Sequence, residues 1–167
     1  RHSGRIWRIT TKGRPLQDPP SIADAPIDDL LDILKRPEYR YRYWTKRELR
    51  ERDPAAVEAA LDRWVANLDA EDPRFRHHQI EAVWLYRGIG ATRPDLLREL
   101  LACNDHHARA AATGQLRYWS SALPDSAELL RKAANDANGI VRMQAAIAAS
   151  YIGTKPAFDA VLDTLKH

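Results

Sequence analysis

Apolar residues recur at helical spacing along most of this chain, and the clearest pattern lies between residues 94 and 119. The first part of this stretch carries four leucines at spacing i, i+1, i+4 and i+5, which predicts a helix with one apolar face. Asn104-Asp105 then interrupts the pattern with residues typical of turns and helix N-caps. A narrow stripe of alanines follows and ends in Tyr118-Trp119. The stretch therefore predicts two helices joined by a sharp turn.

The same two-helix unit recurs after 33 residues in both directions along the chain. Three columns of residues keep this period: Arg76, Arg109 and Arg142; Asp72, Asp105 and Asn138; and Leu31, Trp64, Leu97 and Leu130. Columns in register over several units indicate a helical repeat. We expect each Asp or Asn to cap its own helix, and each Arg to reach the turn of the adjacent repeat. We predict that the six polar residues form a structural ladder.

Similar apolar patterns and helix stop signals extend this prediction over the rest of the chain. We expect helices over residues 26–36, 39–52, 54–68, 74–87, 94–103, 106–119, 123–134, 140–152 and 155–165. These helices predict an all-α fold, a right-handed α-solenoid of about four helix pairs plus one helix, over residues 26–167. In the second helix we expect Tyr39, Tyr43 and Leu49 to face the core. In the last helix, Phe158 belongs to an apolar face that we expect to be partly uncovered.

The first 25 residues do not follow the helical pattern. Residues 4–10 alternate as a β-strand does, and residues 11–25 are rich in proline and lack periodicity. We expect residues 1–10 to be the remnant of an upstream sheet domain and residues 11–25 to be a linker. Because the sequence starts with Arg rather than Met, we also expect the chain to be part of a longer protein.

Composition and charge narrow the classes of function. The 167 residues are 44% hydrophobic and 29% charged, as in a globular domain, and their apolar runs are too short to span a membrane. The net charge of +3 is small for a dedicated nucleic-acid binder, although residues 39–52 hold six Lys or Arg against two Glu. Cys103 is the only cysteine, which excludes a disulfide within the chain, and we expect its side chain to be buried.

The basic stretch 39–52 is the strongest candidate for an interaction site. Its arginines alternate with aromatic residues, and such surfaces can stack on bases or sugars. The predicted patch consists of Arg40, Arg42, Trp44, Lys46, Arg47 and Arg50. The other aromatic residues are expected to pack between repeats: Trp64, Trp84, Tyr86, Tyr118, Trp119 and Tyr151.

No residue pattern predicts catalysis or metal binding. The adjacent pairs His77-His78 and His106-His107 point about 100° apart on a helix, so neither pair can hold one ion. The sequence lacks a nucleophile elbow, a phosphate-binding glycine loop and an H-E-x-x-H motif. We therefore predict that this chain is not an enzyme and has no catalytic residue, metal ligand or cofactor of its own.

The repeated order of Asp or Asn, an Arg four residues later and then paired alanines resembles the HEAT repeat. Residues 105–112 and 138–146 carry this order best, and the segments around Arg76 and Arg42 are weaker copies. The resemblance covers residues 26–167. It implies a non-catalytic scaffold or protein-interaction module that spaces, orients or binds other domains.

A narrower resemblance spans the chain in order. It runs through GRIWRIT at residues 4–10, KGRPL at 12–16, KRELRER at 46–52, and on to AAAT and LRYW between 110 and 119. These segments are similar to the exported proteins of planctomycete-type bacteria that join a sugar-dehydrogenase-like β-propeller, a HEAT array and a c-type cytochrome, a membrane-bound dehydrogenase family.

This second resemblance implies that residues 1–10 end a β-propeller and that residues 26–167 begin a HEAT array. It also implies a periplasmic or exported location, and electron transfer through haem c held elsewhere in the parent chain. The haem motif C-x-x-C-H is absent from these 167 residues, so no haem-ligating or catalytic residue is carried over to them. The implied partners are adjoining domains of the same chain or another protein.

The alternative is a nucleic-acid-binding HEAT-like protein of the DNA alkylation-repair glycosylase kind. Such proteins hold DNA in a basic groove lined with Trp and Tyr, and their chemistry needs an Asp near these aromatic residues. Here the basic residues are concentrated in 39–52 instead of being spread over several repeats. The sequence therefore favours the scaffold over the nucleic-acid enzyme.

Overall fold

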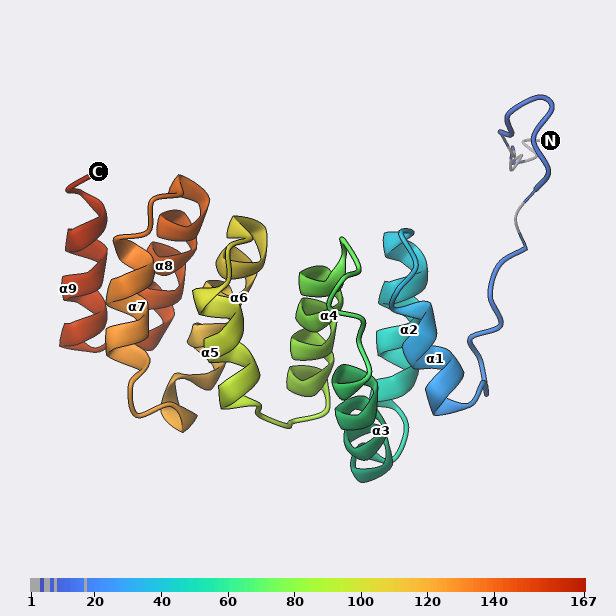
Figure 1. The fold of residues 1–167 in the computed structure, drawn as a ribbon, viewed down its shortest axis with the longest axis horizontal. Coiled ribbons are helices and arrows are strands. Elements are labelled where there is room, and N and C mark those ends of the chain that lie inside the picture. The colour runs from blue at the N-terminus through green and yellow to red at the C-terminus, as the bar shows by residue number, and fades with distance from the viewer. Residues whose placement is uncertain (1–3, 5–6, 8, 17) are drawn as a thin grey trace.

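The computed structural model describes residues 4, 7, 9–16 and 18–167, and all of its regular elements within these ranges are helices (Figure 1). They are α1 (Ile27–Ile33), α2 (Tyr39–Arg50), α3 (Pro54–Ala66), α4 (Phe75–Gly88), α5 (Pro94–Ala102), α6 (His106–Trp119), the 3₁₀ turn η1 (Ser120–Ala122), α7 (Ser126–Ala134), α8 (Gly139–Ile152) and α9 (Lys155–Thr164). The prediction of an all-α fold is confirmed. The strand predicted over residues 4–10 falls largely outside the described residues.

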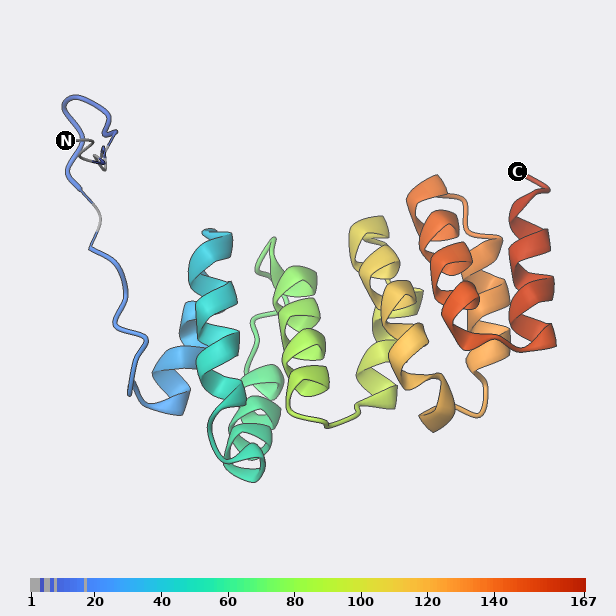
Figure 2. The same ribbon diagram turned by 180° about the vertical axis from the view of Figure 1, so that it is seen from behind.

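The helices stand side by side in a row that runs from α1 at one end to α9 at the other (Figures 1 and 2). Successive even-numbered helices contact one another: α2 contacts α4, α4 contacts α6, and α6 contacts α8. The odd-numbered helices pack against the even-numbered ones, and α1 also contacts α3, as α7 contacts α9. The described residues 18–25 lead away from the row at the α1 end (Figure 2).

Leucines fill the space between the helices, as the apolar stripes predict. Leu97 and Leu100 of α5, Leu116 of α6 and Leu130 of α7 are fully buried. Burial of a leucine side chain contributes about 1.5–3 kcal/mol, so these residues account for much of the cohesion between neighbouring helices. Cys103 is also buried, as predicted, and its thiol donates to the carbonyl of Asp105.

Small residues let α6 and α8 approach closely. Ala112 of α6 and Ala145 and Ala148 of α8 are buried at this contact. Gly114 completes the surface, because a Cβ atom there would lie only 2.9 Å from Oε1 of Gln144 in α8. The alanine stripe of the sequence thus lies where α6 and α8 contact each other.

Side-chain caps fix where α6 and α8 begin. The carboxylate of Asp105 accepts from the backbone N–H of His107 at 2.8 Å, and the amide oxygen of Asn138 accepts from the N–H of Ile140 at 2.9 Å. Such caps satisfy donors that the first helical turn leaves unpaired. Asp72 lies two residues before the N-cap of α4, Arg74, and accepts from the N–H of Arg74 instead.

Helix α2 is rotated relative to the sequence prediction. Leu49 is buried as expected, but Tyr39 and Tyr43 are exposed, and the buried positions are Arg42, Thr45 and Leu49. The prediction for the two tyrosines is wrong because an arginine takes the inward position. Its charge is compensated by a carboxylate from α4, which the local sequence cannot reveal.

Candidate interaction surface

Two arginines of the predicted ladder, Arg109 and Arg142, close the turn within their own helix pairs. Arg109 and Arg142 are the fourth residues of α6 and α8, and each donates through Nη1 to the carbonyls five and six residues earlier. Arg42, the fourth residue of α2, makes the same pair of bonds to Arg36 and Pro37. These guanidiniums satisfy carbonyls at the ends of the preceding helices or in the turns that follow them.

The register is different in α4. The fourth residue of this helix is His78, whose ring lies 3.3 Å from the carboxylate of Asp72. Arg76, the second residue, pairs instead with Glu99 of α5 and donates to Gln79. The position in α4 that matches Arg42, Arg109 and Arg142 is therefore occupied by a histidine.

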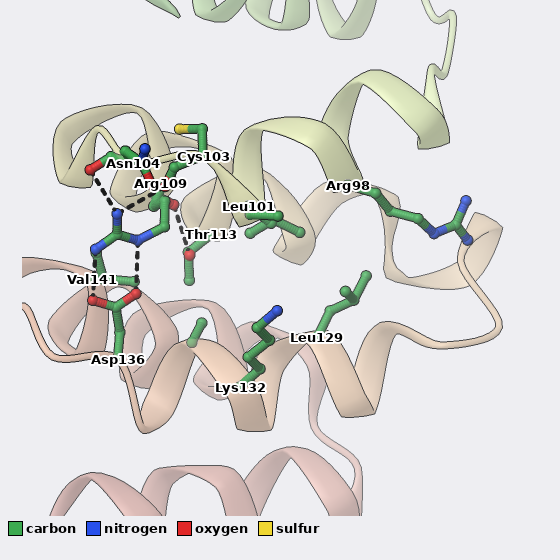
Figure 3. Close-up of a pocket in the computed structure, with 12 residues that line it drawn as sticks. Arg98, Leu101, Cys103, Asn104, Arg109, Thr113, Leu129, Lys132, Asp136 and Val141 are labelled. Carbon is green, nitrogen blue, oxygen red and sulfur yellow. Dashed lines mark hydrogen bonds and ion pairs between the residues drawn. The ribbon is translucent and has the colours of Figure 1, made fainter.

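Arg109 also joins two consecutive repeats (Figure 3). Its Nε and Nη2 atoms donate to the two carboxylate oxygens of Asp136, in the turn before α8, at 2.8 and 2.9 Å. This bidentate pair holds the pKa of Asp136 below its usual value. A cavity of about 300 Å³ beside the pair is lined by Leu101, Leu129 and Lys132, among others.

A buried carboxylate ties α2 to α4. The side chain of Glu81 is only 1% exposed and accepts from Nε of Arg42 at 2.8 Å and from Nζ of Lys46 at 2.5 Å. Two members of the predicted interaction patch, Arg42 and Lys46, are thus paired inside the protein. Nε2 of His77 lies 3.4 Å from the same carboxylate, and burial lowers the pKa of this histidine.

The rest of the predicted patch lies on the surface of α2. Arg40, Trp44, Arg47 and Arg50 are exposed. The guanidinium of Arg47 lies 5.0 Å from the centre of the Trp44 ring, and Tyr43 packs edge-on against this ring at 5.5 Å. The structure therefore brings one exposed cation of the patch, Arg47, onto an aromatic ring.

A groove continues this surface between α2 and α4. It has a volume of about 310 Å³ and is lined by Tyr39, Tyr43, Lys46, Arg50, Trp84, Leu85 and Arg87. The ammonium of Lys46 lies 4.9 Å from the centre of the Trp84 ring. The lining combines three aromatic rings with three cations and contains no carboxylate. We call it the α2–α4 groove.

Beyond the groove, arginines and tyrosines alternate across α4, α6 and α8. The guanidiniums of Arg87 and Arg117 lie 4.4 and 4.6 Å from the centre of the Tyr118 ring. Arg117 also lies 5.1 Å from the ring of Tyr151. We call Arg50, Arg87, Tyr118, Arg117 and Tyr151 the arginine–aromatic row.

The two tyrosines of this row were expected to pack between repeats, and that prediction is wrong. Tyr118 is 48% exposed and Tyr151 is 70% exposed, whereas Tyr86 and Trp119 are buried. A 33-residue spacing places residues at equivalent positions of successive repeats, and such positions can face outward as well as inward. The sequence signal for Tyr118 is the adjacent Arg117, whereas Tyr151 has no arginine beside it in the sequence and meets Arg117 only in the fold.

The cations of this surface differ in their partners from the arginines that pair with a carboxylate on another helix or turn. Within the described ranges, Arg47, Arg50, Arg87 and Arg117 have no carboxylate within ion-pairing distance, whereas Arg93, Arg98 and Arg109 each pair with at least one. Arg87 is held instead by a 3.4 Å hydrogen bond to Gln115 and by the Tyr118 ring. These guanidiniums are therefore positioned by neutral groups and keep their charge uncompensated.

Comparisons of the chain with protein-family models, curated proteins and solved structures found no match. In the part of the chain that the structure covers, no three His, Cys, Asp or Glu side chains gather closely enough to hold a metal ion. Nor is any helix there long and apolar enough to cross a membrane. The arginine–aromatic row and the α2–α4 groove are thus the features from which a function can be argued.

The buried histidine of α4 gives a prediction about pH. Burial lowers the pKa of His78, whose side chain is 3% exposed, although its contact with Asp72 opposes this shift. The unfolded chain therefore binds a proton more readily, and stability should fall as the pH drops below the unfolded pKa of about 6.5. Urea unfolding at pH 7.5 and pH 5 should show this loss in the natural chain and a smaller one in His78→Gln. The exposed His107→Gln serves as the control, and equal losses in all three would contradict the role of His78.

Proposed function

We propose that this chain is a non-catalytic, HEAT-like solenoid of right-handed sense that binds an acidic segment of polypeptide on its even-numbered helices. The observation that carries this proposal is the set of four guanidiniums on α2, α4 and α6 that lack carboxylate partners, three of which, those of Arg47, Arg87 and Arg117, lie on aromatic rings. An anion that pairs with such cations makes charge-assisted hydrogen bonds, which are about twice as strong as neutral ones. The contacts between successive even-numbered helices support the solenoid.

The distribution of charge favours a polypeptide over nucleic acid. A duplex needs basic residues over a broad surface, because affinity comes from many phosphate contacts. Here most arginines outside the row are paired with carboxylates, and the net charge is only +3. The α2–α4 groove also offers a partly apolar lining, which suits an aromatic or aliphatic side chain.

In the setting that the family resemblance implies, the acidic segment would belong to an adjoining domain or to another exported protein. The module would then orient the domains between which electrons pass, while the haem and the dehydrogenase chemistry stay outside these residues. This setting is part of the proposal and rests on the resemblance alone.

The proposal is tested by titrating the chain with a random copolymer of Glu and Tyr, and separately with single-stranded and duplex DNA, at physiological salt. We expect the copolymer to bind and the double variant Arg47→Glu/Arg87→Glu to weaken it by roughly tenfold or more, since each charged hydrogen bond is worth about 1.5–3 kcal/mol. Arg63→Glu/Arg131→Glu makes the same charge change on α3 and α7, and should have little effect. Tighter binding of DNA, or an equal loss in both double variants, would contradict the proposal.

A further inference from the structure

We infer that the bound polypeptide is extended and crosses α4, α6 and α8 with an acidic side chain at about every third residue, next to one large apolar side chain in the α2–α4 groove. This inference rests on the proposed function and adds the conformation and the sequence pattern of the partner. It follows from three features: the reach of each arginine, the spacing of the helices, and the lining of the groove.

Each arginine of the row extends from its own helix onto the next even-numbered helix. Arg50 of α2 lies over Gly88 of α4, where a Cβ atom would be only 2.7 Å from its Cδ. Arg87 of α4 lies on Tyr118 of α6, and Arg117 of α6 lies on Tyr151 of α8. The three guanidiniums therefore follow one another across the helices.

The spacing of packed helices sets the spacing of the cations. Neighbouring helix axes lie about 8–10 Å apart, so successive guanidiniums of the row are separated by a similar distance. An extended polyproline II segment rises about 3.1 Å per residue with about three residues per turn, so every third residue lies on the same face and advances by about one helix. A helical ligand rises about 1.5 Å per residue and would need about six residues for the same step, which would turn its acidic side chains to different faces.

We expect an anion to bind in the middle of the arginine–aromatic row, near Tyr118. Two guanidiniums, from Arg87 and Arg117, lie on the one ring of Tyr118. Their like charges repel each other, and the described residues place no carboxylate between them. A carboxylate bound beside either cation would reduce this repulsion, as Glu81 compensates the charges of Arg42 and Lys46.

The lining of the α2–α4 groove predicts the apolar residue of the bound segment. The groove takes its apolar surface from Tyr39, Tyr43 and Trp84, and it is also lined by Arg50 and Arg87. Its volume of about 310 Å³ suits a large side chain such as Leu or Trp. The expected segment therefore has one large apolar residue, followed or preceded by acidic residues about three and six positions away.

The test is calorimetric titration of the full chain with synthetic peptides of one composition, with one Trp and two Glu, whose Glu spacing is two, three or four residues. Each peptide is also made with its sequence reversed, because the row can be followed in either chain direction. We expect the three-residue spacing to bind roughly tenfold more tightly than the other two, in one direction, since a misplaced acid loses one charged hydrogen bond.

Three variants locate the binding. Arg87→Gln and Arg117→Gln should each weaken binding of the three-residue peptide, and Arg131→Gln on α7 should not. Gly88→Ala keeps every charge and favours the helix, but its added methyl must displace Arg50, so it should also weaken binding. Circular dichroism of each variant confirms that it is folded.

The outcomes separate this inference from the proposed function. If the Glu–Tyr copolymer binds but the three spacings are equivalent, the extended register is wrong while the proposed function stands. If neither the copolymer nor any peptide binds, both are wrong. If single-stranded DNA displaces the peptides and binds more tightly, the row is a nucleic-acid site and both are again overturned.

Discussion

Glu81→Ala is expected to lower the free energy of unfolding by about 3–5 kcal/mol, the usual cost of leaving buried charges without their partner. The carboxylate is almost fully buried and accepts from both Arg42 and Lys46, which come from a different helix. Its removal leaves two cations in a site that water reaches poorly. Urea denaturation followed by circular dichroism at 222 nm measures the change, on the order of several kcal/mol.

Two further variants define the cause of this loss. Glu99→Ala removes a carboxylate that is half-exposed and pairs with Arg76, so it should cost no more than about 1 kcal/mol. Glu81→Leu combined with Arg42→Met and Lys46→Met removes all three charges and should recover part of the stability lost in Glu81→Ala, less the two hydrogen bonds that Arg42 donates to the carbonyls of Arg36 and Pro37. A loss below about 1 kcal/mol in Glu81→Ala would show that α2 and α4 are not held together by this cluster.

Arg109→Ala is expected to cost about 1–3 kcal/mol, because the guanidinium joins the carbonyls of its own turn to the carboxylate before α8. Asp136→Ala should cost a similar amount, since it removes the other half of the bidentate pair. The double variant should lose less than the sum of the two single losses, because both remove one shared interaction.

The same cycle with Asp105→Ala gives the contrast. Asp105 caps α6 through the N–H of His107, so its loss should cost about 1 kcal/mol and be close to additive with that of Arg109→Ala. Additive losses for Arg109→Ala and Asp136→Ala, or strong coupling of Arg109 to Asp105 alone, would contradict the role of the Arg109–Asp136 ion pair in holding α6 to the turn before α8.

The sequence predicted the helices well where local signals decide the structure. The positions of α5 to α8 could be predicted from the N-caps Asp105 and Asn138 and from the stripes of leucine and alanine. The 33-residue period does not extend to the earlier repeats, because α4, α6 and α8 begin at Phe75, His106 and Gly139, which is 36, 31 and 33 residues after the preceding even-numbered helix. In the sequence, Asp72 and Arg76 keep the 33-residue spacing to Asp105 and Arg109. In the structure they do not occupy the equivalent positions, because Asp72 is not the N-cap of α4 and Arg76 is the second residue of this helix instead of the fourth.

The candidate site was predicted less completely, because it depends on contacts between distant residues. Arg42 and Lys46 appear as part of a basic patch until Glu81, 39 and 35 residues away, turns them inward. Tyr118 and Tyr151 appear as core residues until the rotation of α6 and α8 is known. The sequence predicted only the part of the interaction surface that lies on the exposed side of α2. The part that lies on α4, α6 and α8 could not be predicted without the fold.

The most direct test of the proposed binding surface is an NMR titration that follows the side-chain Nε–Hε signals of the arginines while the Glu–Tyr copolymer is added. We predict that the signals of Arg47, Arg50, Arg87 and Arg117 shift together with saturation of binding. The signals of Arg93, Arg98 and Arg109, which are already paired with carboxylates, should stay in place. Shifts spread equally over both groups, or confined to the paired arginines, would contradict the account.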